Sequence, residues 1–163
     1  MNKVMKNDVQ QNTIIFDLDG TLANVDKRRD LAMKSGKMDW DVWFDPENIQ
    51  LDEPNEPVVK TAQLFAEAGF TIAIFSGRLD TTEKSTRSWL TRHRIPFHFL
   101  NMRPVDKKFV PDDVLKKSWL LKHEQAREFG KDSVFMVVDD RQKVVDMWRD
   151  LGLTVFQVAP GDF

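Results

Sequence analysis

The sequence of 163 residues contains no cysteine. Disulfide bonds and thiolate catalysis are therefore excluded, and we expect a reducing, cytoplasmic setting. The chain also lacks any run of about 18 apolar residues, which is the length that a membrane-spanning helix needs. The first twelve residues have no apolar core, so we expect residues 1–12 to be a polar lead-in rather than a secretory signal. These absences favour a protein that does not engage a membrane.

A large excess of charge of one sign is also missing, because the formal net charge is −2. The chain as a whole is therefore not drawn to nucleic acid, and binding of a polyanion requires a local basic patch. Two interpretations of the basic residues in the second half stay open, a lip that binds a polynucleotide and ordinary solvated surface charge. The residues concerned are Arg87, Arg92, Arg94, Arg103, Lys107 and Lys108.

Short apolar runs alternate with amphipathic stretches, which is typical of βα units and a parallel sheet. The sequence has no internal repeat, and its length suits one domain over residues 13–163. The near-continuous apolar run at 134–138 predicts a central strand that is buried on both faces. Gly69, Gly130 and Gly152 are expected to end three helices. We expect an α/β fold with strands at 13–16, 70–75, 96–100, 134–138 and 154–158, and helices at 57–68, 81–92, 111–129 and 142–151.

Residues 25–55 form a poorly periodic stretch that is longer than most loops in compact domains. Three aromatic side chains, Trp40, Trp43 and Phe44, lie within five residues of one another there. One interpretation is a small insert that buries these rings against the main core. The other interpretation is a cap that covers the functional site.

The stretch Ile14–Leu22 has the strongest functional signal in the chain. An apolar run ends in two aspartates, Asp17 and Asp19, and a Gly-Thr pair follows them. The carboxyl ends of parallel strands carry the binding sites of open α/β sheets, so both carboxylates are expected there. Two carboxylates so close repel each other unless a cation or a proton separates them. The stretch therefore predicts a metal site, with Mg²⁺ as the ion that prefers such oxygen ligands.

Two further polar clusters close other predicted strands. Ser76, Gly77 and Arg78 end the second strand, where a hydroxyl, free backbone N–H groups and a guanidinium fork can hold phosphate oxygens. A plain turn is the alternative for that string taken alone. Asp139 and Asp140 end the central strand, and adjacent acids at a buried position are costly unless they meet a cation or donors.

A lysine pair lies early in the predicted helix at 111–129. Lys116 and Lys117 could form a solvated face, but one lysine in the site would offset the negative charge of the aspartates and a phosphate. Lys116 follows Asp112 by four residues, so these two side chains could pair and orient the amine.

The string Asp17-Leu18-Asp19-Gly20-Thr21 resembles the first motif of the haloacid-dehalogenase (HAD) superfamily of phosphohydrolases, and the later clusters follow the order of its other motifs. The resemblance implies a three-layer, Rossmann-like fold with a minimal cap at 25–55. It implies that Asp17 is a nucleophile that forms an aspartyl-phosphate and that Asp19 is a general acid/base. It further implies catalytic roles for Ser76 and Lys116, and a Mg²⁺ site made by Asp17, Asp19, Asp139 and Asp140.

The C-terminal third, from Asp139 to Phe163, resembles the 3′-phosphatase domain of the polynucleotide kinase-phosphatases of T-even phages. That resemblance implies that a nucleic-acid 3′-phosphate end or a nucleotide is the substrate. It also implies that Arg28, Arg78, Gly77 and Thr21 bind it. The chain has no Gly-x-x-x-x-Gly-Lys-Ser/Thr loop, so we expect no 5′-kinase activity in it and a phosphatase that stands alone.

Two rival functions remain open at the level of sequence. The first is a phosphatase of free nucleoside monophosphates or other small phosphomonoesters, with the Trp-rich insert closing over a base. The second is a non-catalytic module that binds nucleic-acid ends. The intact set of acids and the lysine argue against the second rival.

Overall fold

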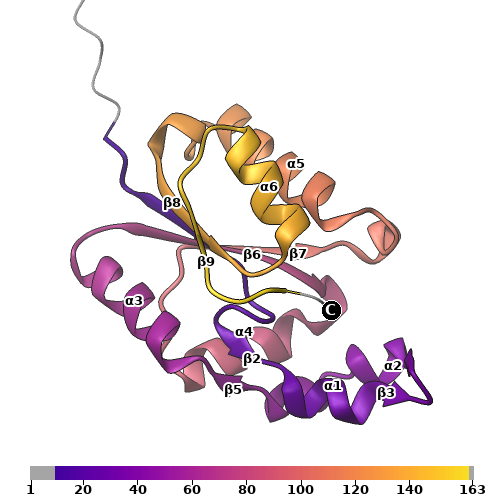
Figure 1. The fold of residues 1–163 in the computed structure, drawn as a ribbon. Coiled ribbons are helices and arrows are strands. Elements are labelled where there is room, and N and C mark those ends of the chain that lie inside the picture. Colours follow the sequence, from indigo (N-terminus) through magenta and orange to yellow (C-terminus); the bar gives the residue numbers. More distant parts are fainter. Residues whose placement is uncertain (1–9, 162–163) are drawn as a thin grey trace, which may run out of the picture.

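A five-stranded sheet with the order β7-β6-β1-β8-β9 carries the fold (Figure 1). Every neighbouring pair in it is parallel, as the alternation of strands and helices predicts. The computed structural model describes residues 10–161. The strands of the sheet are β1 (Thr13–Phe16), β6 (Thr71–Leu79), β7 (Phe99–Arg103), β8 (Val134–Asp139) and β9 (Val155–Gln157).

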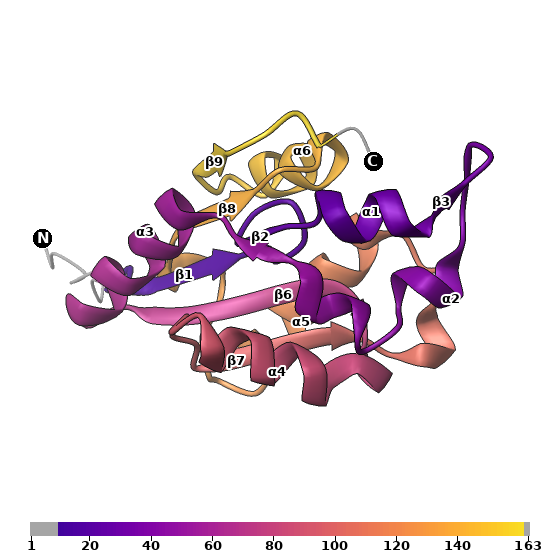
Figure 2. The same ribbon diagram turned by 90° about the horizontal axis from the view of Figure 1, so that it is seen from below.

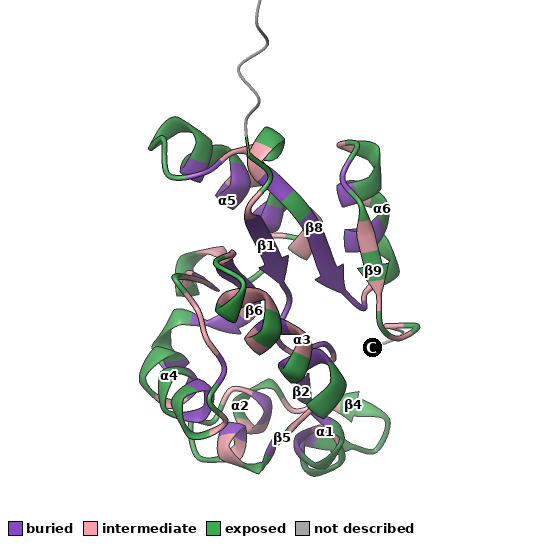
Figure 3. Cartoon of the chain, turned by 90° about the vertical axis from the view of Figure 1, so that its left-hand side faces the viewer, coloured by how far each residue is buried: buried purple, intermediate pink, exposed green. Residues whose placement is uncertain are grey.

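Two helices cover each face of this sheet, which gives the predicted three layers. Along β1, the side chains of Ile14 and Phe16 face one core and that of Ile15 faces the other, as the two-residue period of a strand requires. The first core is closed by α3 (Glu56–Glu67) and α4 (Glu83–Arg92), and the second by α5 (Asp112–Gln125) and α6 (Gln142–Asp150). Figure 3 shows β1 as buried along its length and β8 as mostly buried, as the apolar run at 134–138 predicts.

Several element boundaries differ from the expected ones. The third strand lies at Phe99–Arg103 and not at 96–100, and the second strand continues through to Leu79. The helix expected at 111–129 ends at Gln125, because Arg127 takes the left-handed conformation with φ of 58°. Gly130 is extended and ends no helix, whereas Gly69 and Gly152 have positive φ after α3 and α6, as expected.

The insert after β1 is a small cap built from short elements. Figure 2 shows it beyond the ends toward which β1 and β6 point. Trp43 is 7% exposed and belongs to the core, whereas Trp40 is 52% exposed, so each interpretation of the aromatic cluster holds for part of it. The elements of the cap are α1 (Asp26–Ala32), β3 (Met33–Lys34), β4 (Lys37–Met38), α2 (Trp40–Trp43) and η1 (Asn48–Leu51), with a ribbon of β2 (Ala23–Asn24) and β5 (Glu53–Pro54) at its base.

Three short 3₁₀ helices complete the fold, η2 (Asp80–Thr82), η3 (Val105–Lys107) and η4 (Lys131–Ser133). Within residues 10–161, no helix is both long enough and apolar enough to cross a membrane. Most of the expected polar lead-in, residues 1–9, lies outside the described part of the chain.

Candidate active site

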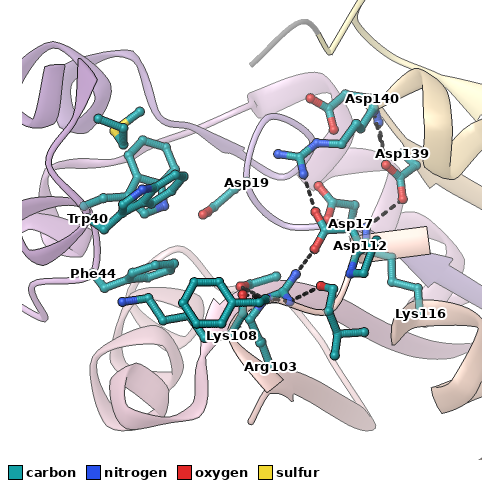
Figure 4. A pocket seen from close by; sticks show the side chains of 17 residues that line it. Asp17, Asp19, Trp40, Phe44, Arg103, Lys108, Asp112, Lys116, Asp139 and Asp140 are labelled. Atoms are coloured by element: carbon teal, nitrogen blue, oxygen red, sulfur yellow. Dashed lines mark hydrogen bonds and ion pairs between the residues drawn. The ribbon is translucent and has the colours of Figure 1, made fainter. Parts of the chain in front are cut away.

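The predicted polar clusters meet at one edge of the sheet. Asp17 follows β1, Gly77 lies near the end of β6, and Asp139 ends β8. These three strands are neighbours, so their carboxyl ends open into one pocket of about 680 Å³ between the sheet and the cap (Figure 4). The order of the strands therefore brings together residues that lie far apart in the sequence.

Three buried carboxylates form a cluster that suits a cation. Asp17, Asp139 and Asp140 each offer one oxygen, and these oxygens lie within 4.8 Å of one another. Burial raises the pKa of Asp17 well above its usual range; the charge of Lys116 counteracts this effect, whereas the charges of Asp139 and Asp140 add to it. Burial and the charge of Asp139 raise the pKa of Asp140 to about 6. The protein's own groups therefore compensate only part of the negative charge of these three carboxylates.

Two atoms of this cluster show that a metal ion fits. Oδ2 of Asp17 and Oδ2 of Asp140 are buried and have no hydrogen-bond partner within the described residues. Buried carboxylate oxygens without a partner are costly, and a hard divalent cation such as Mg²⁺ binds oxygens of this kind. The donor set therefore suits a metal ion, and Mg²⁺ stays the expected ion.

Lys116 reaches this cluster from α5. Its Nζ lies 2.6 Å from Oδ1 of Asp17 and 2.8 Å from Oδ2 of Asp139. Burial alone would lower the pKa of Lys116, but the two carboxylates outweigh it and raise the pKa, so the side chain is an ammonium. Within residues 10–161, Asp112 and Lys116 do not form the expected direct ion pair, because Asp112 instead accepts hydrogen bonds from Arg103 and Arg141, but the charge of Asp112 still helps to raise the pKa of Lys116.

Asp19 lies at the pocket but points away from the carboxylate cluster. Its Oδ1 lies 2.8 Å from Nη2 of Arg28 and 2.6 Å from Nη2 of Arg78. Burial alone would raise the pKa of Asp19, but the two guanidinium groups outweigh it and lower the pKa to about 2. The Asp19 side chain is therefore ionised in the free protein, and a role of Asp19 as a metal ligand stays a prediction.

Asp52 is a buried partner that the sequence analysis missed. It accepts hydrogen bonds from Nε and Nη2 of Arg28 at 2.9 and 2.8 Å, and from Nη2 of Arg78 at 2.7 Å. Burial and the charge of Asp19 raise the pKa of Asp52 to about 6, although both arginines counteract them. Asp52 belongs to no motif, and only the need of two buried arginines for counter-charges could have indicated it.

The residues expected to bind substrate differ in how far they face the pocket. Arg28 and Arg78 are buried and paired with carboxylates, so their role as substrate contacts stays a prediction. Gly77 lines the pocket, and a Cβ atom there would lie 3.1 Å from Oδ1 of Asp112. The hydroxyl of Ser76 is buried and accepts a hydrogen bond from the backbone N–H of Arg78. Oγ1 of Thr21 lies 3.5 Å from Oδ1 of Asp140.

Of the six basic residues considered for a lip, Arg103 and Lys108 line the pocket. Arg87 instead pairs with Glu83 on the surface of α4, and Arg92 donates to a backbone carbonyl of the cap. Arg103 also pairs with Asp112, so the exposed ammonium of Lys108 is the part of this set best placed to meet a substrate.

The parallel sheet, its covering helices and the small cap form a HAD-like fold. A phosphatase from Clostridium difficile superposes with a TM-score of 0.65 at 13% identity, over 91% of this chain and 85% of its own. The L-2-haloacid dehalogenase of Xanthobacter autotrophicus superposes with a TM-score of 0.62 at 13% identity, over 90% of this chain and 77% of its own. At such identities the likeness establishes the fold alone, and it confirms the expected fold class.

The family described as the polynucleotide kinase PNKP phosphatase domain matches residues 11–163, and the chain belongs to it. It is therefore a phosphatase domain of the HAD superfamily. A chain in a structure of a Pnkp1/Rnl/Hen1 complex superposes with a TM-score of 0.76 at 29% identity, over 94% of this chain and 48% of its own.

A relative in Autographa californica nuclear polyhedrosis virus is named as a candidate bifunctional polynucleotide kinase/RNA ligase. It is 32% identical over 152 residues, which are 90% of this chain and 19% of the viral protein. The chain thus spans about a fifth of that relative and about half of the chain in the solved complex. The expected lack of kinase activity and the stand-alone character therefore stay predictions.

Proposed function

We propose that this phosphatase domain removes 3′-phosphate groups from polynucleotide ends in a Mg²⁺-dependent reaction. The observation that carries the proposal is the buried cluster of Asp17, Asp139, Asp140 and Lys116, in a chain that belongs to the PNKP phosphatase family. The names of the relatives support the substrate class, since one is called a polynucleotide kinase/RNA ligase and another belongs to an RNA repair complex.

In the proposed reaction, Asp17 attacks the phosphorus atom and forms an aspartyl-phosphate, which divides a difficult hydrolysis into two steps. Its Oδ1 is held by the ammonium of Lys116 at 2.6 Å, which fixes the carboxylate and offsets the charge of the phosphoryl oxygens. Ser76 and the backbone near Gly77 are proposed to hold those oxygens. Mg²⁺ bound by Asp17, Asp139, Asp140 and the backbone carbonyl of Asp19 would neutralise the charge that develops on the phosphate.

Asp19 is the proposed general acid and base. Arg28 and Arg78 lower its pKa and keep its carboxylate ionised in the free protein, which is the form that the second step needs, when Asp19 accepts a proton from the water that cleaves the aspartyl-phosphate. The first step needs Asp19 in its protonated form, so that it can donate to the leaving 3′-oxygen. A substrate phosphate that draws the guanidinium groups away from Asp19 would favour that form, because burial then dominates its pKa.

A phosphatase of free nucleoside monophosphates is the second candidate. The pocket of about 680 Å³ is of the size that small-molecule sites have, and Trp40 and Phe44 in its wall could cover a base. The non-catalytic alternative has less support, because a binding module has no need of three buried acids arranged around a buried ammonium.

The proposed function is tested with one single-stranded oligonucleotide that carries its phosphate at the 3′ end or at the 5′ end. With Mg²⁺ present, we expect phosphate release from the 3′ form and little from the 5′ form. Asp17→Asn should abolish release while the circular dichroism spectrum stays unchanged. Equal hydrolysis of both forms would contradict the 3′ assignment, and substantial activity of the variant would contradict Asp17 as the nucleophile.

A further inference from the structure

The pocket has an aromatic wall in which Phe44 also packs against the core, whereas the two exposed rings, Trp40 and Phe109, belong to neither core cluster. Trp40 and Phe44 line the pocket from the cap, and Phe109 lines it from the segment between η3 and α5. Trp40 is 52% exposed and Phe109 is 94% exposed. Trp43, which lies between Trp40 and Phe44 in the chain, is buried in the core and anchors the insert there. Large exposed rings beside a charged site indicate a surface that binds a ligand.

Two of these rings stack on each other and together form an apolar surface on the cap. Trp40 begins α2 and Phe44 follows its last residue, so the two side chains lie one helical turn apart. Their ring centroids are 5.9 Å apart, and the interplanar angle is 21°. Figure 4 shows both side chains across the pocket from Asp139 and Lys116, with Asp19 between the two groups. The near-parallel rings and the charged cluster therefore face the same space.

From this arrangement we infer that the aromatic wall, Trp40, Phe44 and Phe109, stacks against the nucleobase of the 3′-terminal nucleotide; the inference rests on the proposed function. A terminal base is joined through one sugar to the phosphate that is removed. With that phosphate at Asp17, the base lies one sugar away from it, and these rings supply apolar surface in the same pocket. Every nucleobase has a π-face, so stacking of this kind tolerates all sequences.

The charges around the wall agree with a polynucleotide as the occupant. The exposed ammonium of Lys108 lines the pocket next to Phe109 in the chain, where it can meet the phosphodiester that precedes the terminal nucleotide. Stacking on these rings would also select between single-stranded and base-paired 3′ ends. A base that stacks on protein rings has left the stack of its own duplex, so single-stranded or frayed ends are the preferred substrates.

The test combines a truncated protein with a truncated substrate. Two single-stranded oligonucleotides carry the same 3′-phosphate, one with a terminal base and one with an abasic terminal residue. The Trp40→Ala and Phe109→Ala variants should lower kcat/KM about tenfold or more for the first substrate. Both variants should leave kcat/KM for the abasic substrate close to that of the wild type. Trp40→Phe should keep most of the activity, because it keeps a ring.

Phe156→Ala is the matched control, because Phe156 is 58% exposed but does not line the pocket. It should change neither substrate's kcat/KM. Equal losses on both substrates in Trp40→Ala and Phe109→Ala would show that the rings maintain the pocket without contacting the terminal base, and the inference would be overturned while the 3′-phosphatase function stands. If the wild-type protein releases phosphate from neither 3′-phosphorylated oligonucleotide, the proposed function itself fails.

Discussion

At the scale of single residues, the site is defined by an imbalance of charge. The ammonium of Lys116 pairs with Asp17 and Asp139, Asp140 lies beside them, and two of the carboxylate oxygens have no hydrogen-bond partner within the described residues. Burial of uncompensated charge is costly, so the folded protein favours protons or a metal ion at this position. The cluster therefore links the stability of the domain to both pH and Mg²⁺.

The raised pKa of Asp140 determines how the stability of the domain changes with pH. Its pKa is about 6 in the folded protein against 3.8 for an ordinary Asp, so the folded state binds more protons than the unfolded state in that interval. The contribution of Asp140 to stability without metal is thus complete at low pH and is lost as the pH rises through about 6. Mg²⁺ competes with these protons, so it should raise the melting temperature much more at about pH 8 than at about pH 5.

Thermal unfolding with and without Mg²⁺ at the two pH values measures this effect. Asp140→Asn is the control, and the dependence on Mg²⁺ and on pH should both be smaller in it. A Mg²⁺ stabilisation that is equal at both pH values would contradict the assignment of these carboxylates as the metal ligands.

A second residue-scale prediction concerns the buried arginine pair. Arg28 is fully buried, bonds both Asp19 and Asp52, and lies 4.2 Å from the ring of Trp43. Arg28→Ala leaves both acids short of one counter-charge and should lower the free energy of unfolding by about 3–5 kcal/mol. The preceding residue is the matched control, since Lys27 pairs with Glu53 at the surface, with both side chains at least 60% exposed.

Urea denaturation of Arg28→Ala and Lys27→Ala compares the two. Lys27→Ala should change stability little, because exposed ion pairs contribute little. Equal effects of the two substitutions would contradict a structural role for the buried network.

The sequence predicted those site residues that are charged and that lie at the end of a strand or early in a helix. Asp17 follows β1, Asp139 ends β8 and Lys116 lies early in α5, and the structure places all three together. It was uninformative about partners that depend on the third dimension. Asp52 comes from the far end of the insert, and no spacing along the chain relates it to Arg78.

At the scale of elements, the C-terminal segment contacts the loop after β8, which carries Asp140. Gln157 in β9 donates to the backbone carbonyl of Asp140, and Gly161 lies against the same backbone. A Cβ atom on Gly161 would overlap the carbonyl of Asp140 and the Cα of Arg141. Gly161→Ala should therefore displace this loop and weaken Mg²⁺ binding.

Gly152→Ala is the matched control, because Gly152 also has positive φ but a Cβ atom there meets nothing within 4 Å. Both substitutions should cost about 1–2 kcal/mol of backbone strain. Only Gly161→Ala should reduce Mg²⁺ affinity, as measured by isothermal titration calorimetry. An unchanged affinity would show that the C-terminal segment does not position Asp140.

The elements themselves were largely predictable, and their ends were not. The apolar runs located β1 and β8, because a buried parallel strand needs continuous apolar residues. The third strand was placed three residues too early, since its register depends on pairing with β6. The end of α5 depends on Arg127, whose left-handed conformation is uncommon for a residue other than glycine or asparagine.

At the scale of the whole molecule, the order of the strands creates the pocket and the small cap shapes its entrance. β6, β1 and β8 lie side by side and direct their ends toward the cap (Figure 2). The cap contributes one buried and one exposed tryptophan, Trp43 and Trp40, so it is anchored in the core and still faces the site. A cap of this size leaves room for a substrate that extends beyond the pocket.

The measurement that tests the central claim most directly compares phosphate release with Mg²⁺ from two kinds of substrate at matched concentration. One is a short single-stranded oligonucleotide with a 3′-phosphate, and the other is a set of nucleoside 3′- and 5′-monophosphates. We predict a strong preference for the oligonucleotide, which weakens as the salt concentration rises because binding releases counterions. Preference for a mononucleotide would contradict the claim, would leave the chemistry of Asp17 in place, and would make the cap a cover for a free base.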